Sequence, residues 1–143
     1  WRIFEDFVCT ALGEAMANRG QRTATQHRIY LDIDDRVAMR PDLLCFDSTH
    51  NAIAAIDAKY KAEKPEGFPD ADLYQMLAYC TALGLSRGHL IYAKGNEQPT
   101  VHTVRRAGVT IHCHALDLSL TPPELLGRIN GLAASILITP ADN

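Results

Sequence analysis

The sequence lacks several features that mark membrane proteins, secreted proteins and nucleotide hydrolases. No window among its 143 residues approaches the roughly 20 apolar residues that a membrane-spanning helix needs. No basic stretch followed by an apolar run and a small-residue cleavage site marks a secretion signal. These absences predict a soluble, cytoplasmic protein. The phosphate-binding motif GxxxxGK[ST] is also missing, which argues against hydrolysis of GTP or ATP by this chain.

The cysteines do not indicate a metal cluster, and the overall charge does not indicate a general attraction to nucleic acid. The four cysteines lie far apart in apolar segments and form no CxxC pair, so we expect buried free thiols. No serine or cysteine nucleophile motif is present. Lys and Arg number 14 against 17 Asp and Glu, a formal net charge of -3. Any contact with nucleic acid therefore depends on a local basic patch.

The remaining composition is that of one globular domain. Apolar residues make up 47% of the chain and charged residues 22%. A chain of this size buries roughly 68% of its surface on folding, which is enough for a single core. The sequence starts at Trp1 inside an already helical pattern, so we interpret residues 1–143 as one domain cut from a longer protein.

Apolar periodicity predicts three helices and six strands. Helical spacing covers residues 1–19, about 70–84 and about 122–138. Asp70 or Asp72 is expected to cap the second helix, and Thr121 the third. Strands are expected at residues 23–31, 37–46, 52–59, 89–93, 100–104 and 109–116. The order αβββαβββα predicts an α/β fold in which helices flank a mixed β-sheet.

Two acidic residues should meet at the end of a hairpin. If the turn centres on Thr49 and His50, facing residues have numbers that sum to 99, which pairs Asp42 with Asp57. Two carboxylates so placed repel each other unless a cation lies between them. A hard divalent ion such as Mg²⁺ suits oxygen ligands, so this pair is a candidate metal site.

A lysine accompanies the second acid. Asp57 and Lys59 lie two residues apart on a strand and share a face, while Ala58 turns its side chain away. A cation beside a metal suits phosphate chemistry, because it holds a phosphoryl oxygen or orients the attacking water. Taken alone, the same spacing fits an ion pair on the surface equally well.

Two further segments bring polar side chains toward this pair. Gln75 and Tyr79 lie one turn apart on the second helix, and we expect them to border the polar site rather than fill the core. Glu5 offers a carboxylate from the first helix. An exposed acid favoured by the helix dipole explains Glu5 equally well.

Taken in chain order, these segments resemble the motifs of a known nuclease family. The segments are Phe4-Glu5-Asp6-Phe7-Val8, Arg40-Pro41-Asp42-Leu43, Asp57-Ala58-Lys59 and Gln75-x-x-x-Tyr79. The last three resemble the motifs of the RecB-like branch of the PD-(D/E)xK nuclease superfamily. More narrowly, all four are similar to the C-terminal nuclease domain of the McrC family, which serves 5-methylcytosine-specific McrBC restriction systems. The similarity covers roughly residues 1–93.

The resemblance implies a restriction-endonuclease-like fold and Mg²⁺-dependent hydrolysis of DNA phosphodiester bonds, with Mn²⁺ as a substitute. The implied metal ligands are Asp42, Asp57, the main-chain carbonyl of Ala58, and Glu5. Lys59 would then position the attacking water. Gln75 would orient Lys59 or the phosphate, and Tyr79 would support the site or contact the DNA backbone.

The resemblance also implies partners. McrC-like proteins dock on an AAA+ GTPase of the McrB type through an N-terminal region, which we expect to be missing from this fragment. Arg40, Lys61 and Lys64 are candidate contacts to the DNA backbone. A solvated charged loop explains the two lysines almost as well.

Two other readings of the chain stay open at this point. It could be a catalytically silent, nuclease-like module for DNA binding or assembly, or another RecB-like DNA-processing nuclease. The run His112-Cys113-His114 looks like a metal motif, but strand alternation points Cys113 away from the two histidines. We therefore expect a structural or solvent-facing role for it.

Overall fold

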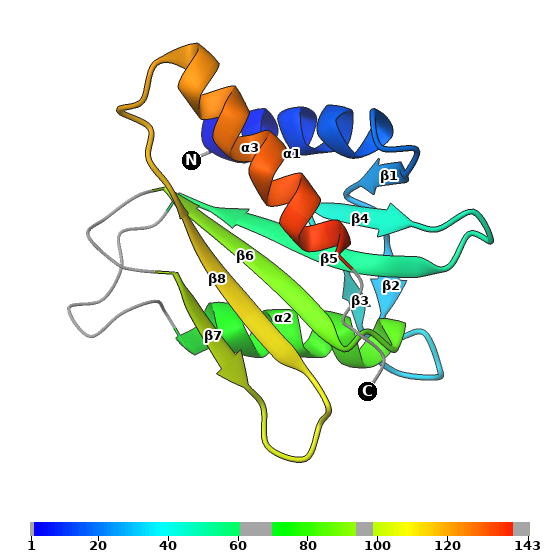
Figure 1. Ribbon diagram of the computed structural model, residues 1–143. Helices are drawn as coiled ribbons and strands as arrows, with labels where there is room; N and C mark the ends of the chain where they lie inside the picture. Colours follow the sequence, from blue (N-terminus) through cyan, green and yellow to red (C-terminus); the bar gives the residue numbers. More distant parts are fainter. Residues whose placement is uncertain (1, 61–69, 94–98, 139–143) are drawn as a thin grey trace.

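The protein forms three layers, with helices on both faces of one sheet. A computed structural model describes residues 2–60, 70–93 and 99–138. Helices α1 (Arg2–Ala17) and α3 (Pro122–Leu137) cover one face, and α2 (Asp70–Leu83) covers the other (Figure 1). The α/β class with flanking helices is therefore confirmed.

The main sheet is mixed. Its order is β1 (Arg22–Thr25), β4 (Leu43–Phe46), β5 (Ala52–Lys59), β6 (Arg87–Ala93), β8 (Thr110–Leu116) and β7 (Thr100–Thr103). The three strands β5, β6 and β8 are parallel to one another, and the other neighbours are antiparallel. Because helices cover both faces, the central strands are apolar on both sides.

Alternation along β5 divides the core into two clusters. Ala54, Ile56 and Ala58 pack toward α1 and α3, while Ala55 packs toward α2. From Ala54 to Lys59, the odd-numbered positions of this strand therefore face α2. This parity decides where the polar side chains near the end of β5 emerge.

The first two expected strands are each divided, which corrects the prediction of continuous strands at 23–31 and 37–46. The chain leaves β1 through Gln26, whose left-handed φ of 52° redirects it. Strands β2 (Ile29–Tyr30) and β3 (Ala38–Met39) then pair in a separate two-stranded sheet. Pro41, which has no N–H to donate to a ladder, separates β3 from β4. The expected order αβββαβββα thus gains two short strands.

The helix ends agree with the sequence at α3 and differ at α2. Thr121 caps α3, and its side chain and that of Glu124 bond each other's backbone N–H groups in a capping box. Asp70 is the first residue of α2 and Asp72 lies within its first turn, so Asp72 is not the predicted cap. Both acids still have the sign that favours a helix N-terminus.

All four cysteines are buried free thiols, as expected: Cys9, Cys45, Cys80 and Cys113. Among the helices that the structure describes, none has the length and apolar character needed to cross a membrane.

The contact of β6 with α2 allows a stability test. A Cβ atom at Gly88 would lie 2.5 Å from Met76 Cγ and Sδ and 2.7 Å from Cys80 Sγ. Both neighbours are fully buried. We expect Gly88→Ala to lower the free energy of unfolding by about 1–3 kcal/mol, because the added methyl overpacks this contact. Urea denaturation measures the change.

Gly131→Ala is the matched control. A Cβ atom at Gly131 on α3 meets no atom within 4 Å. Because glycine disfavours a helix interior, this variant should be more stable by about 0.5–1 kcal/mol. Equal unfolding free energies for the two variants would contradict the close packing at Gly88.

Candidate active site

The predicted register of the β4–β5 hairpin is confirmed. Leu43 pairs with Ile56 and Leu44 with Ala55, so facing numbers sum to 99. The register shifts only near the turn, between Cys45 and Phe46. Asp42 directly precedes β4 and lies beside Asp57, as the register requires.

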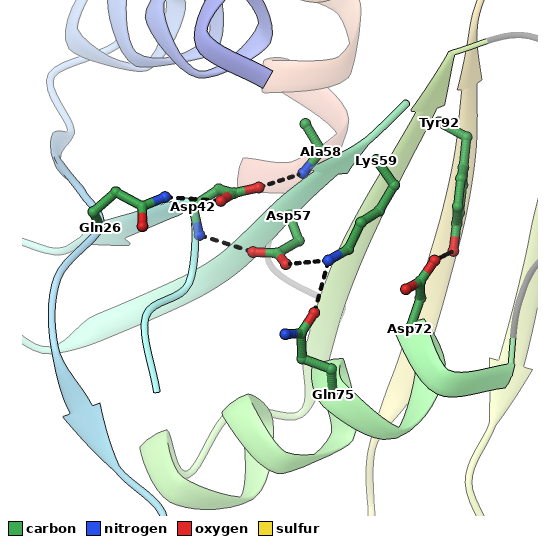
Figure 2. A network of polar contacts seen from close by, with 8 residues as sticks. All are labelled: Gln26, Asp42, Asp57, Ala58, Lys59, Asp72, Gln75 and Tyr92. Atoms are coloured by element: carbon green, nitrogen blue, oxygen red, sulfur yellow. Dashed lines mark hydrogen bonds and ion pairs between the residues drawn. The ribbon is translucent and has the colours of Figure 1, made fainter. Parts of the chain in front are cut away.

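The two acids are held by each other's strand. The Asp42 main-chain N–H donates to Asp57 Oδ1 at 2.8 Å, and the Ala58 main-chain N–H donates to Asp42 Oδ2 at 3.0 Å (Figure 2). Two backbone N–H groups therefore compensate the charges of this pair, which the sequence did not predict. We call this reciprocal arrangement of Asp42, Asp57 and Ala58 the carboxylate interlock.

Lys59 lies between the interlock and α2. Its ammonium Nζ is 3.1 Å from Asp57 Oδ2 and donates to Gln75 Oε1 at 2.8 Å (Figure 2). The side chains of Lys59 and Asp57 are only 17% and 4% exposed. A solvated surface ion pair does not fit this burial. Ala58 points the other way into the α1–α3 core, as predicted.

Burial and neighbouring charges change the acidity of both groups. Burial, followed by the charge of Asp42, raises the pKa of Asp57 to about 6 despite the opposing effect of Lys59. Burial alone would lower the pKa of Lys59. The charge of Asp57, their hydrogen bond and the charges of Asp72 and Asp42 instead raise it above its ordinary value. Near neutral pH the lysine is therefore a cation. Asp57 is mostly ionised there but takes up a proton more readily than an ordinary aspartate.

A cavity of about 960 Å³ opens beside the interlock. Glu5, Arg40 and Asp42 are among the residues that line it. Glu5 is half-buried, and burial followed by the charge of Asp42 raises its pKa. The structure thus brings Glu5 and Arg40 to the site as predicted. Lys61 and Lys64 lie outside the described residues.

Tyr79 differs from its predicted placement. It is 3% exposed and packs in the α2-side core with Met76 and Cys80, so it fills the core instead of bordering the site. Gln75 is exposed and borders the site as predicted. Burial raises the pKa of Tyr79, and so do the charges of Asp57 and Asp42. The ring is therefore within electrostatic reach of the carboxylates.

Three polar residues of this region were not found from the sequence. Gln26 donates its side-chain N–H to Asp42 Oδ1 at 2.8 Å, and its main-chain N–H bonds the Asp42 carbonyl at 3.2 Å. The Tyr92 hydroxyl donates to Asp72 Oδ2 at 3.0 Å. Of the three, only Asp72 was marked in the sequence, as an acid in the first turn of a helix whose other residues are suited to packing. The Gln26 contact depends on a left-handed turn that no glycine marks.

Three histidines form a cluster on the sheet face opposite α2. His112 and His114 share a face with His89, and His89 Nδ1 lies 3.1 Å from His114 Nε2. Cys113 points away into the α2-side core, as predicted. Burial, followed by His114 and His112, lowers the pKa of His89 to about 2. Burial, followed by His112, lowers the pKa of His114 to about 4. These two rings are therefore neutral at pH 7.

A cation at the interlock would need main-chain help. Across residues 2–60, 70–93 and 99–138, no three His, Cys, Asp or Glu side chains are arranged to hold a metal by themselves. The Ala58 N–H points toward Asp42. In a β-strand the N–H and C=O of one residue point to the same side, so the Ala58 carbonyl is oriented toward the same region. Two carboxylates and this carbonyl form an all-oxygen donor set that fits Mg²⁺.

Comparisons with known proteins agree with this architecture. Residues 2–93 match the family described as McrBC 5-methylcytosine restriction system component. A search of curated proteins gives no match. A solved half-complex from the tetradecameric assembly of Thermococcus gammatolerans McrB AAA+ hexamers with bound McrC contains a chain of similar fold, with a TM-score of 0.74 and 14% identity. The similarity covers 95% of this chain and 33% of that chain.

The family match and the site coincide. The matched residues 2–93 include every residue of the interlock and its neighbours Gln26, Arg40 and Gln75. Since the match extends over more than half of the sequence, the chain belongs to the family of McrBC 5-methylcytosine restriction system components.

Proposed function

We propose that this chain is the Mg²⁺-dependent DNA endonuclease domain of a McrBC-type restriction system. The observation that carries the proposal is the partly buried ammonium of Lys59, held between Asp57 and Gln75 beside a second carboxylate. A silent scaffold has no use for two adjacent acids and a buried lysine, because each costs desolvation energy. The arrangement instead suits the cleavage of a phosphate ester.

The donor set determines the kind of metal. Asp42, Asp57 and the Ala58 carbonyl would hold Mg²⁺, with Glu5 as a further ligand and Mn²⁺ as a substitute. Hard oxygen ligands favour these ions over softer metals. When bound, the ion would act as a Lewis acid on the phosphate and lower the pKa of a nearby water.

The side chains around the interlock supply the remaining chemistry. The Lys59 ammonium donates to a phosphoryl oxygen or to the attacking water, and it stabilises the negative charge that develops in the pentacovalent transition state. Gln75 accepts from Lys59 and so limits the directions in which the ammonium donates. In this reaction water attacks phosphorus directly, the P–O bond to one deoxyribose oxygen breaks, and that oxygen leaves with a proton as a hydroxyl group. No covalent enzyme intermediate forms.

The DNA backbone would approach from the cavity beside the interlock. Arg40 lines this cavity together with Asp42, and a guanidinium there is suited to hold a phosphate next to the scissile one. We propose Lys61 and Lys64 as further backbone contacts. Tyr79 would act as a support below the carboxylates, since its ring is buried.

A motor protein is the proposed partner. The structurally similar chain comes from an assembly of McrB AAA+ hexamers with bound McrC, and the present chain covers a third of its length. We propose that an AAA+ GTPase of the McrB type loads this domain onto DNA in the cytoplasm. A region outside these residues would make that contact.

Removal of the acid or the lysine tests the reaction. We expect Asp57→Ala and Lys59→Ala each to reduce Mn²⁺-dependent nicking of supercoiled plasmid by about 100-fold or more, because each removes a charge that acts on the transition state. Circular dichroism should show an unchanged fold. Asp34→Ala, which removes an exposed acid outside the site, is the control and should nick normally. Full activity in both site variants would disprove the proposal.

Metal affinity should depend on pH through Asp57. The pKa of this carboxyl is raised to about 6, and a cation binds only its ionised form. Affinity for Mn²⁺ should therefore fall as the pH decreases through about 6, and binding near that pH should release a proton. Calorimetric titrations in two buffers of different ionisation enthalpy measure both effects. An affinity that stays constant from about pH 5 to about pH 8 would rule out Asp57 as a ligand.

A further inference from the structure

A second polar contact lies next to the one that holds Lys59. Lys59 and Tyr92 are register partners on the parallel strands β5 and β6. Asp72 and Gln75 lie three residues apart on α2, and so on neighbouring positions of one helix surface. Lys59 bonds Gln75, and Tyr92 bonds Asp72, so two adjacent contacts connect this end of the sheet to the first turns of α2 (Figure 2).

The two contacts differ in burial. Asp72 is 3% exposed and Tyr92 is fully buried, whereas Gln75 is exposed. A buried carboxylate is costly unless it is hydrogen-bonded, so the Tyr92–Asp72 contact has little freedom to rearrange. Gln75 has no comparable packing of its own. Its position over Lys59 therefore depends on where the start of α2 is held.

We propose that Asp72 is a positioning residue of this site, which acts through Gln75 on Lys59. Anchored by the Tyr92 hydroxyl, its carboxylate fixes the first turns of α2 against β6, so that the Gln75 amide oxygen meets the lysine ammonium. The proposal rests on the proposed nuclease function only for its effect on rate. The arrangement of Gln75 and Lys59 is testable without catalysis.

A double-mutant cycle tests the route of action. Asp72→Ala and Gln75→Ala should each reduce Mn²⁺-dependent nicking about tenfold, the scale of losses found when partners of site residues are removed. If Asp72 acts through Gln75, the double variant should lose no more than either single variant. Losses that multiply to about 100-fold would overturn the proposal. Asp72→Asn keeps an oxygen for the Tyr92 hydroxyl and should recover most of the activity.

A measurement on the metal-free protein separates this proposal from the nuclease proposal. The side-chain amide signals of Gln75 in a ¹⁵N-correlated NMR spectrum should shift in Asp72→Ala and Tyr92→Phe. They should stay in place in Thr81→Ala, which removes a hydrogen bond to the Leu77 carbonyl on the same helix. A wild-type protein that does not nick DNA would count against the nuclease proposal alone, because this spectrum still decides the role of Asp72.

A second variant covers the case in which Asp72→Ala does not fold. Should Asp72→Ala fail to fold, Tyr92→Phe takes its place in the cycle, because it removes only one hydroxyl group. Unchanged Gln75 signals in a folded Tyr92→Phe or Asp72→Ala variant would overturn the positioning role.

Discussion

The carboxylate interlock is the constraint on which the rest of the site depends. The N–H of Asp42 bonds the Asp57 side chain, and the N–H of Ala58 bonds the Asp42 side chain. These bonds extend the β4–β5 pairing beyond the last ladder pair, Leu43 with Ile56. Because each acid is held by the other's strand, neither can move without releasing the other. The carboxylates are thus positioned before any ligand arrives, and preorganised charge is what a phosphate-cleaving site requires.

The two faces of the sheet have separate tasks. Toward α1 and α3, β5 presents the apolar side chains of Ala54, Ile56 and Ala58. Toward α2 it presents Asp57 and Lys59, and Gln75 of that helix accepts a hydrogen bond from Lys59. Charge is therefore concentrated where α2 meets the sheet edge. Burial, followed by the charge of Asp42, is why Asp57 binds its proton more tightly than an ordinary aspartate.

Much of the fold and of the site was predictable from the sequence, for local reasons. Helical periodicity, the Thr121 cap and the hairpin turn depend on neighbouring residues, and strand parity then placed Asp57 and Lys59 on one face. The left-handed turn at Gln26, which divides the first strand, was not predictable, because no glycine marks it. The break in the second strand was marked by Pro41. Tyr79 was misplaced because apolar residues occur around much of α2. Contact with β5, β6 and β8 decides which side of that helix faces inward.

The parity of β5 has a consequence for how such a chain can change over time. From Ala54 to Lys59, the charged side chains lie at odd-numbered positions and the residues of the α1–α3 core at even-numbered ones. Loss or gain of one residue within the strand would exchange these roles, placing the lysine under α1 and an alanine opposite α2. Length variation among related chains should therefore collect in the turn Asp47–Asn51, where Asp47 bonds local backbone groups and the ends can readjust. Changes within β5 should therefore be substitutions, not insertions or deletions.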